Sequence, residues 1–303
     1  MNILKVENLK KAYGDNKVLK GVNLSIDSPG IRALVGPNGS GKTTLFSVIT
    51  NLLKTDTGSV EILGMKNNNP DVFREISFLK DNTVLYSYLT GLDHLQFIAY
   101  AQSLPKSRID EVCEIIGISN YVRDKTGTYS LGMKQHLLLA MAIMNKPKLM
   151  ILDEPLNGLD PTSIIKIRKL LKEMANEGTA ILLSSHTLSE IDLITSDILF
   201  LSEGKIIDED ISRYKTIEYK LLLKDESISK ASLLLENNKN ITLRASKLIY
   251  RTSELDIQRF IKMITEKGIE FTEINKRRIG AEERYKSIFP EESIKEEEMV
   301  NKI

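Results

Sequence analysis

Apolar residues recur over the first part of the chain in short runs that are bounded by glycine, asparagine and acidic residues. The segment Ile3–Ile26 is rich in Val, Ile and Leu and is interrupted at Gly14-Asp15-Asn16, which predicts two strands joined by a turn. The shorter run Ile31–Val35 predicts a third strand, and it ends directly at a glycine-rich stretch. The hydrophobic pattern therefore predicts a β-rich beginning that leads into a glycine-rich loop.

The spacing of apolar residues becomes helical immediately after that loop. From Lys42 to Leu53, the residues Leu45, Ile49 and Leu52 fall on one face of a helix. The glycine-rich stretch is therefore predicted to connect a strand to a helix.

A mainly helical stretch is predicted over about residues 82–145. Thr90 and Asp93 have the spacing of a capping box, with a carboxylate in place of the usual Glu or Gln. Ser107 is predicted as the N-cap of a second helix, and the apolar run Leu137–Met144 belongs to a third. We expect these helices to form an insertion between strand-rich parts of the fold.

Strand and helix patterns alternate again beyond the insertion. The buried-type runs Lys148–Leu152 and Ala180–Ser184 flank the amphipathic segment Ile164–Met174, and this order is typical of a parallel, doubly wound sheet. Two short runs on either side of Glu203-Gly204 predict a hairpin. The fold class predicted for residues 1–215 is therefore α/β, with a parallel sheet, an antiparallel β part and a helical insertion.

A second, smaller unit is predicted over residues 216–303. Its patterned segments are strand-like at Tyr219–Leu223, Leu248–Arg251 and Phe271–Ile274, and helix-like at Leu255–Lys267. These segments predict a small α+β domain. Its last stretch, Glu291–Ile303, is polar and acidic and is expected to be frayed or helical.

Composition narrows the classes of protein that fit this pattern. The chain of 303 residues has 42 basic and 41 acidic side chains, and a formal net charge of +1 gives no support to general nucleic-acid binding. Cys113 is the single cysteine, so no internal disulfide is possible and a reducing, cytosolic location is expected. Residues Met1–Leu9 have no long apolar stretch, so no secretory signal is expected, and no apolar run reaches the ~20 residues that span a bilayer. A membrane role would need a second chain to span the bilayer.

The loop Gly36-Pro37-Asn38-Gly39-Ser40-Gly41-Lys42-Thr43 matches G-x-x-x-x-G-K-[ST], the phosphate-binding loop or P-loop. Its glycines permit backbone conformations that let successive N–H groups approach a phosphate, at the N-terminus of a helix. Lys42 is predicted to contact the β and γ phosphates, and the Thr43 hydroxyl to contact Mg²⁺. Thr44 is also predicted to bind ATP. The alternative, a glycine-rich turn that packs a strand on a helix, leaves Lys and Thr at these offsets unexplained.

Two carboxylates, Asp153 and Glu154, follow the apolar strand Leu149–Leu152. In an open α/β sheet, ligands bind outside the carboxyl ends of the strands, which is where this pair lies. We expect Asp153 to orient Mg²⁺ and Glu154 to polarise an attacking water. In isolation the pair would be better interpreted as a solvated turn, but the upstream P-loop favours the catalytic interpretation.

These motifs, with three that follow, resemble the ATP-binding subunit of an ABC transporter over about Asn2–Asp210. The segment Tyr129–Gln135 is similar to the family's signature motif in the form found in drug and peptide exporters. The resemblance implies that Ser130 and Gly132 contact the γ-phosphate held by an opposite subunit. Taken alone, Ser130 would be interpreted as a plain helix N-cap.

The resemblance assigns three further residues. Asn157-Gly158-Leu159-Asp160 is similar to the D-loop, so Asp160 is placed at the dimer interface. His186 corresponds to the switch histidine, which would bond the γ-phosphate and support Glu154. Tyr13 occupies the position of an aromatic that stacks on adenine, although a half-buried strand tyrosine would have the same pattern. A lone histidine is more often structural, so the role of His186 depends on the resemblance.

The sequence departs from the family pattern at three positions. The usual Gln near the γ-phosphate and Mg²⁺ aligns with Asp81, or with a residue one position away. Asp81 could reach the metal but would add negative charge near the phosphates. His136 stands where Arg is usual, and Leu156 where Thr or Ser is common. Since neither of these two touches a phosphate, activity is expected to survive.

The resemblance implies a mechanism and partners. Two subunits, either copies of this chain or a paralogous pair, would close head to tail on ATP and open after hydrolysis. They would drive export by an integral-membrane permease, of a peptide or antibiotic as the narrower hypothesis, from the cytoplasmic face of the cell membrane. Val84–Tyr88 is a candidate permease contact, with packing inside the helical insertion as the alternative. The competing hypotheses are a soluble ABC ATPase that acts as a switch on ribosomes or DNA, and a binding module without turnover.

Overall fold

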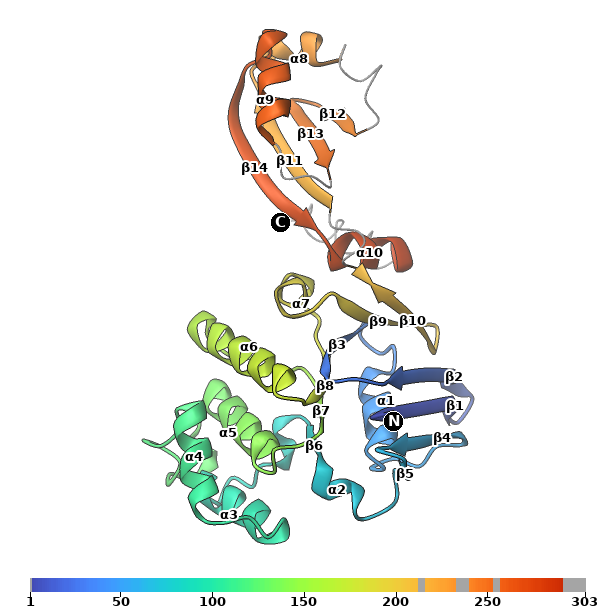
Figure 1. The fold of residues 1–303 in the computed structure, drawn as a ribbon, viewed down its shortest axis with the longest axis vertical. Helices are drawn as coiled ribbons and strands as arrows, with labels where there is room; N and C mark the ends of the chain where they lie inside the picture. The colour runs from blue at the N-terminus through green and yellow to red at the C-terminus, as the bar shows by residue number, and fades with distance from the viewer. Residues whose placement is uncertain (1, 212–215, 233–239, 253–256, 291–303) are drawn as a thin grey trace. The chain divides into compact units, whose positions relative to one another are not determined.

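The computed structural model describes residues 2–211, 216–232, 240–252 and 257–290, which fall into two compact units. The larger unit contains the residues up to Glu209 together with Ile288–Pro290, and the smaller spans Asp210–Ser287. The first is referred to below as the ATP-binding unit and the second as the C-terminal unit. Figure 1 gives the order of their elements along the chain.

Two sheets form the framework of the ATP-binding unit. The antiparallel sheet has the order β2-β1-β4-β5 and contains β1 (Leu4–Tyr13), β2 (Asn16–Ile26), β4 (Thr57–Ile62) and β5 (Met65–Lys66). The second has the order β10-β9-β3-β8-β7-β6 and contains β3 (Gly30–Val35), β6 (Ile76–Leu79), β7 (Leu149–Leu152), β8 (Ala180–Ser184), β9 (Asp197–Ser202) and β10 (Lys205–Asp210). Strands β6, β7, β8, β3 and β9 pair in parallel, as the strand-helix-strand pattern predicted.

Helices cover both faces of the six-stranded sheet. Helix α1 (Lys42–Ile49) lies on one face and α6 (Pro161–Asn176) on the other (Figure 1). Every residue of β7 and β8 is buried, as expected for parallel strands between two helical layers. One continuous apolar core joins the antiparallel sheet, α1 and the parallel strands. The short elements α2 (Val72–Glu75) and α7 (Leu188–Ile194) complete this part of the unit.

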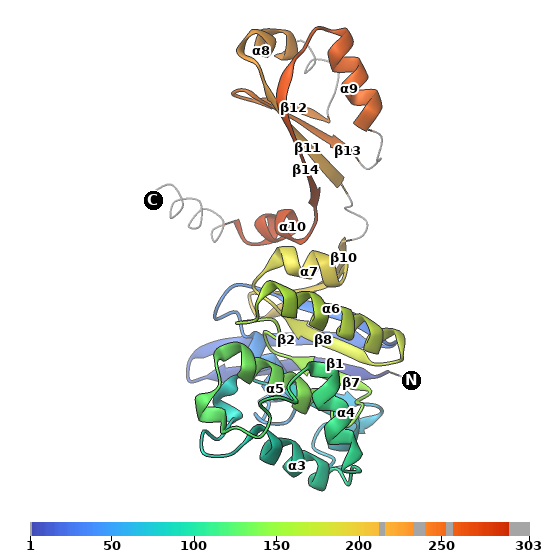
Figure 2. The ribbon, with the colours of Figure 1, turned by 90° about the vertical axis from the view of Figure 1, so that its left-hand side faces the viewer.

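The predicted helical insertion is present and contains α3 (Gly91–Ala101), α4 (Ser107–Ile116) and α5 (Leu131–Ile143), which pack together (Figure 2). Short 3₁₀ turns, η1 (Asn82–Val84) and η2 (Thr126–Thr128), precede α3 and α5. The capping box at the start of α3 is confirmed, because Thr90 and Asp93 each bond the other's backbone N–H. Ser107 is the first residue of α4, whose N-cap is Lys106, so the predicted cap was wrong by one position.

Helix α1 is shorter than its predicted extent of Lys42–Leu53. It ends at Ile49, where the Thr50 hydroxyl bonds the carbonyl of Phe46 and Asn51 adopts a left-handed backbone with φ of 56°. Leu45 and Ile49 are buried as expected, but Leu52 lies beyond the helix and is 65% exposed. The prediction for Leu52 was therefore wrong, because the backbone turns before the helical pattern ends.

The C-terminal unit is a split β-α-β-β-α-β arrangement, which the sequence pattern had not predicted beyond its α+β class. Its elements are β11 (Thr216–Leu223), α8 (Asp225–Ser232), β12 (Ile241–Arg244), β13 (Lys247–Thr252), α9 (Ile257–Glu266) and β14 (Phe271–Ile279). The strands pair antiparallel in the order β12-β13-β11-β14 (Figure 1), and α10 (Ala281–Ile288) follows. The predicted frayed or helical stretch 291–303 lies outside the described residues.

The two faces of the C-terminal sheet differ in polarity. Along β11, Tyr219 and Leu221 are buried against α8 and α9 in the core of the unit. Glu218 points to the opposite face and is 1% exposed. Its carboxylate accepts a bond of 2.9 Å from Arg251 Nε and lies 3.6 Å from Lys220 Nζ. The charge of this buried acid is therefore balanced within the unit.

Candidate functional site

A cavity of about 500 Å³ opens at the carboxyl ends of β3 and β7. The loop before α1 and the residues after β7 both line it. Its wall consists of Val18, Asn38, Gly39, Gly41, Lys42, Thr43, Thr44, Lys80, Asp81, Asn82, Leu131, Gln135, Asp153, Glu154 and Asn157. The structure thus brings the P-loop, Asp81 and the carboxylate pair to one space, although they are far apart in the sequence.

The loop backbone has the conformation that its glycines were expected to permit. Gly39 and Gly41 have φ of 79° and 104°, in the left-handed region where a side chain is strained. A Cβ on Gly36 would lie 2.7 Å from the carbonyl oxygen of Leu201, so no larger residue fits there. The Ser40 hydroxyl is buried and has no hydrogen-bond partner within the described structure. A loop with close backbone packing and an unsatisfied donor is suited to an anion.

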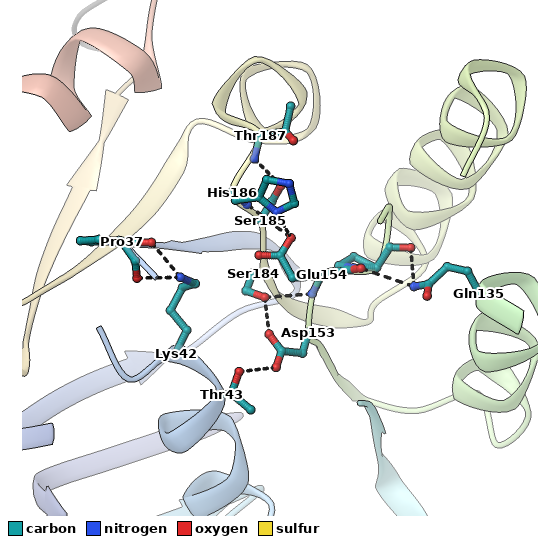
Figure 3. A network of polar contacts seen from close by, with 12 residues as sticks. Pro37, Lys42, Thr43, Gln135, Asp153, Glu154, Ser184, Ser185, His186 and Thr187 are labelled. Carbon is teal, nitrogen blue, oxygen red and sulfur yellow. Dashed lines mark hydrogen bonds and ion pairs between the residues drawn. The ribbon is translucent and has the colours of Figure 1, made fainter. Parts of the chain in front are cut away.

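Lys42 lies across the loop and is almost fully buried. Its Nζ donates to the carbonyl oxygens of Gly36 at 2.7 Å and Pro37 at 3.1 Å (Figure 3). Burial lowers the pKa of Lys42, and the nearby carboxylates of Glu154 and Asp153 oppose that shift. Because a buried ammonium group is unfavourable without a full set of partners, a phosphate in the cavity would stabilise its charge.

Asp153 links helix α1, which follows the P-loop, to strand β8. The Thr43 hydroxyl donates to Asp153 Oδ2 at 2.7 Å, and the Ser184 hydroxyl donates to Asp153 Oδ1 at 2.6 Å (Figure 3). The sequence predicted Thr43 and Asp153 as partners of one metal ion, and the structure places their oxygens in direct contact. Hydroxyl and carboxylate oxygens are the ligands that Mg²⁺ prefers.

Glu154 is held in an unusual backbone conformation with φ of 50°. Its N–H donates to Ser184 Oγ at 2.9 Å, and its Oε2 lies 2.8 Å from His186 Nδ1 (Figure 3). Since a carboxylate only accepts hydrogen bonds, Nδ1 carries the proton in this contact. The backbone N–H of His186 also donates to Oε2, at 3.3 Å. A carboxylate at the mouth of the cavity is thereby oriented by a histidine, as the resemblance implied.

Asp81 lies in the cavity wall, whereas Tyr13 does not. Asp81 caps η1 by accepting from the N–H of Thr83 at 2.9 Å, and the Thr83 hydroxyl also bonds it. These bonds hold the pKa of Asp81 below its usual range, so it is an anion at neutral pH. Tyr13 is 52% exposed at the end of β1, and Val18 on β2 lines the cavity instead.

The predicted signature and D-loop residues begin two helices beside the cavity. Ser130 is the N-cap of α5 and accepts from the N–H of Met133 at 3.2 Å. Asp160 is the N-cap of α6. A Cβ on Gly132 would lie 3.2 Å from the carbonyl oxygen of Gly158, so the two segments are in close contact. Within one chain the cavity wall includes Leu131 and Asn157 from these segments, but not Ser130, Gly132 or Asp160.

Sequence reasoning missed two residues that contact this site. Ser184 bonds both Asp153 and Glu154, as described above. Gln135 Nε2 donates to the carbonyl oxygen of Pro155 at 2.8 Å, which fixes the turn after the carboxylates. Ser184 could have been found from its position as a polar residue at the carboxyl end of an otherwise apolar strand, where ligand-binding edges lie.

Three comparisons with known proteins agree with this geometry. The family model described as "ABC transporter" matches residues 19–157, and one described as "AAA domain, putative AbiEii toxin, Type IV TA system" matches residues 126–192. The chain is 38% identical over 207 residues to "Lantibiotic transport ATP-binding protein SrtF" of Streptococcus pyogenes, covering 68% of this chain and 90% of that protein. It is 38% identical over 211 residues to "Bacitracin transport ATP-binding protein BcrA" of Enterococcus faecalis, covering 68% of each.

Among solved structures, the chain is similar to a dimeric post-hydrolysis state of an ATP-binding cassette bound to ADP and Pi. The TM-score is 0.63 at 26% identity, with coverage of 68% of this chain and 98% of that chain. The matched share of the chain, about two thirds, is close to the size of the ATP-binding unit.

Fold and site together define a P-loop ATPase of the ATP-binding cassette class. The chain belongs to the ABC transporter ATP-binding protein family, and it is an ATP-binding and ATP-hydrolysing subunit of that family. A soluble, non-transport ABC switch is not favoured, since the relatives named above are transport proteins.

Proposed function

We propose that ATP is hydrolysed in the cavity at the carboxyl ends of β3 and β7, with Glu154 as the base. The observation that carries this proposal is the contact of 2.8 Å between Glu154 Oε2 and His186 Nδ1, next to the P-loop. A carboxylate oriented in this way can polarise a water for in-line attack on the γ-phosphate. Lys42 stabilises the charge that develops on the phosphates, and the loop Gly36–Thr44 binds them through the backbone N–H groups of its non-proline residues.

Mg²⁺ is proposed as the metal of this site, with Thr43 and Asp153 as its protein ligands. Among the described residues, no cluster of three or more His, Cys, Asp or Glu side chains could hold a metal ion without help. This donor set fits Mg²⁺, which proteins commonly bind through one or two carboxylates together with substrate phosphates. Asp81 is a third oxygen donor in the cavity wall and is proposed to contact the metal's coordination sphere. The bound ion supplies charge neutralisation for the phosphates.

We further propose that two such cassettes, identical or paralogous, close on ATP. Ser130, Gly132 and Asp160 lie at helix starts beside the cavity but do not line it within one chain. Helix N-termini are suited to anions, so these residues would serve the nucleotide of the opposite subunit. The dimeric cassette bound to ADP and Pi supports this arrangement. Tyr13 is proposed to stack on adenine from its half-exposed position on β1.

The closed dimer is proposed to drive export through a membrane permease. In the described residues no helix is both long and apolar enough to cross a bilayer. The candidate contact is the segment Val84–Tyr88, in which Tyr86 and Tyr88 are 58% and 68% exposed. Its backbone is anchored inward, because the N–H of Tyr86 donates to His94 and its carbonyl accepts from Thr126. An anchored loop with exposed rings supports a contact surface rather than internal packing.

A peptide or antibiotic is the proposed cargo, by analogy with the lantibiotic and bacitracin relatives. The cassette would then be peripheral on the cytoplasmic face of the cell membrane, and no nucleic acid is expected as a partner. Residues 1–215 are proposed as the ATP-binding domain and 216–303 as a C-terminal domain.

The decisive experiment is Glu154→Gln. The amide keeps the size of the side chain but removes the base, so hydrolysis should fall by about 10²- to 10⁴-fold while ATP binding persists. The variant should also accumulate an ATP-bound dimer, measured by light scattering. As a control, adding Ser130→Arg to Glu154→Gln should prevent that dimer without loss of nucleotide binding. Undiminished hydrolysis in Glu154→Gln would remove Glu154 from its proposed role.

A further inference from the structure

Ser184 makes two hydrogen bonds that join the two carboxylate residues of the site. Strands β7 and β8 pair in parallel with Leu152 opposite Leu183, so the next residue on each strand lies at the same edge. The Ser184 hydroxyl accepts from the N–H of Glu154 at 2.9 Å and donates to Asp153 Oδ1 at 2.6 Å. Ser184 is fully buried, which protects both bonds from competition with water.

The direction of these bonds follows from the chemistry of a hydroxyl group. A hydroxyl has a single proton, and a backbone N–H can only donate. The Ser184 hydroxyl therefore donates its hydrogen bond to Asp153, and a lone pair of Ser184 Oγ accepts the bond from the N–H of Glu154. Asp153 Oδ1 is occupied by this bond, and Oδ2 is directed to the Thr43 hydroxyl at 2.7 Å. One side chain thus fixes which carboxylate oxygen faces the P-loop.

We infer that Ser184 is a positioning residue that sets the metal-binding orientation of Asp153 and the backbone conformation of Glu154 together. This inference rests on the proposed function of Asp153 and Glu154. The bond to the Glu154 N–H helps to hold a left-handed φ of 50°, from which the side chain reaches His186. Loss of the hydroxyl would release both residues at once. Partners that orient a metal-binding carboxylate commonly contribute about 10- to 100-fold to metal affinity or activity.

The test compares Ser184→Thr with Ser184→Val in the full-length protein. These two variants place side chains of nearly equal shape in the buried site, and only threonine retains a hydroxyl. The readout besides activity is the affinity for a fluorescent, non-hydrolysable ATP analogue, measured in EDTA and across a Mg²⁺ titration. Ser184→Ala is included in case the extra methyl groups disturb packing. Ser185→Ala is the matched control, because Ser185 is also buried but its hydroxyl accepts only a local bond from Thr187.

The expected result is a selective effect on the metal. Ser184→Val and Ser184→Ala should need about 10- to 100-fold more Mg²⁺ for half-maximal effect and lose kcat by a similar factor. Their analogue affinity in EDTA should match that of the native protein, and Ser184→Thr should behave like the native protein. Equal Mg²⁺ dependence of Ser184→Val and Ser184→Thr would overturn the inference, as would a loss of affinity in EDTA as large as that in Mg²⁺. If the native protein hydrolyses ATP no faster than Glu154→Gln, the proposed function is overturned instead.

Discussion

The C-terminal unit is richer in charged residues than the ATP-binding unit, but among the described residues only the ATP-binding unit gathers them into a site. In the ATP-binding unit, β3, β7 and β8 run in parallel, so the polar groups that follow each strand meet at one edge. In the C-terminal unit the strands are antiparallel, and their carboxyl ends alternate between the two edges of the sheet. Its buried acid, Glu218, lies within a strand and is bonded by Arg251.

This difference shows that convergence of strand ends, rather than burial of charge, brings polar groups together at one site. Glu218 is more deeply buried than Glu154, yet its neighbours neutralise it. His186 orients Glu154 through the carboxylate oxygen Oε2. Among the described contacts, none holds the other oxygen, Oε1, as firmly. A carboxylate that is oriented but not neutralised can act on a substrate. The predictions below test this contrast, in order of decreasing effect.

The largest effect is expected from removing core volume in one unit at a time. Ile151→Ala in β7 and Leu221→Ala in β11 each empty a fully buried position and should cost about 2–5 kcal/mol of local stability. Hydrogen exchange should report the loss in the unit that carries the change. ATP hydrolysis should fall in Ile151→Ala and persist in Leu221→Ala. Lost hydrolysis in Leu221→Ala, with an intact ATP-binding unit, would show that the C-terminal unit controls the site.

A smaller effect is expected from removing one lysine from each unit. Lys42→Ala deletes the buried cation of the P-loop, and nucleotide affinity should fall by about 10- to 100-fold, since a bond to a charged group is lost. Lys220→Ala, which removes a cation beside Glu218, is the matched control and should leave that affinity unchanged. Calorimetric titration with ATP would measure both. An unchanged affinity in Lys42→Ala would contradict the phosphate-binding assignment of the loop.

The smallest effect concerns protonation near neutral pH, which involves the ATP-binding unit because the three histidines of the chain, His94, His136 and His186, all belong to it. Burial lowers the pKa of His136; Asp160 opposes this shift and Lys166 adds to it. The unfolded chain therefore takes up this proton first as pH falls below about 6.5, and the folded state loses stability relative to it.

His136→Gln should accordingly flatten the pH dependence of the unfolding free energy between about pH 7.5 and pH 5.5, the interval in which a histidine titrates. Denaturant unfolding of the native protein and the variant at both pH values is the measurement. An identical slope in the two proteins would show that His136 takes up its proton equally in the folded and unfolded states.

Much of the ATP-binding unit could be predicted from sequence because its signals are local. The run Ala180–Ser184 is β8 to the residue, and Gly39 and Gly41 have the positive φ that the P-loop pattern predicted. Strand β6 (Ile76–Leu79) was missed because Ser77 interrupts its short apolar run, whereas the equally short β7 is apolar throughout. The contact between Ser184 and Asp153 joins residues 31 positions apart, so it depends on the order of strands in the sheet.

The C-terminal unit shows the opposite balance. Three of its strands and one helix were recognisable from their hydrophobic patterns, whereas β12 was missed. The antiparallel order of the strands depends on pairings between distant segments. Helix α8 was missed because its only buried residues are Ser227 and Ala231, which give little hydrophobic signal. Sequence patterns therefore predicted the class of this unit and not its topology, whereas the P-loop restricted the first unit to one class of fold.

The left-handed backbone of Glu154 has a consequence for how this position can change. A non-glycine residue in that conformation typically costs about 1–3 kcal/mol, which glycine would largely avoid. Selection for folding stability alone would therefore favour loss of the glutamate, while selection for ATP turnover would retain it. If Glu154 is the base, as proposed, a variant library screened only for yield or thermal tolerance would favour replacements here that abolish hydrolysis. A glycine at this position in a related chain would then indicate a cassette that had stopped hydrolysing ATP.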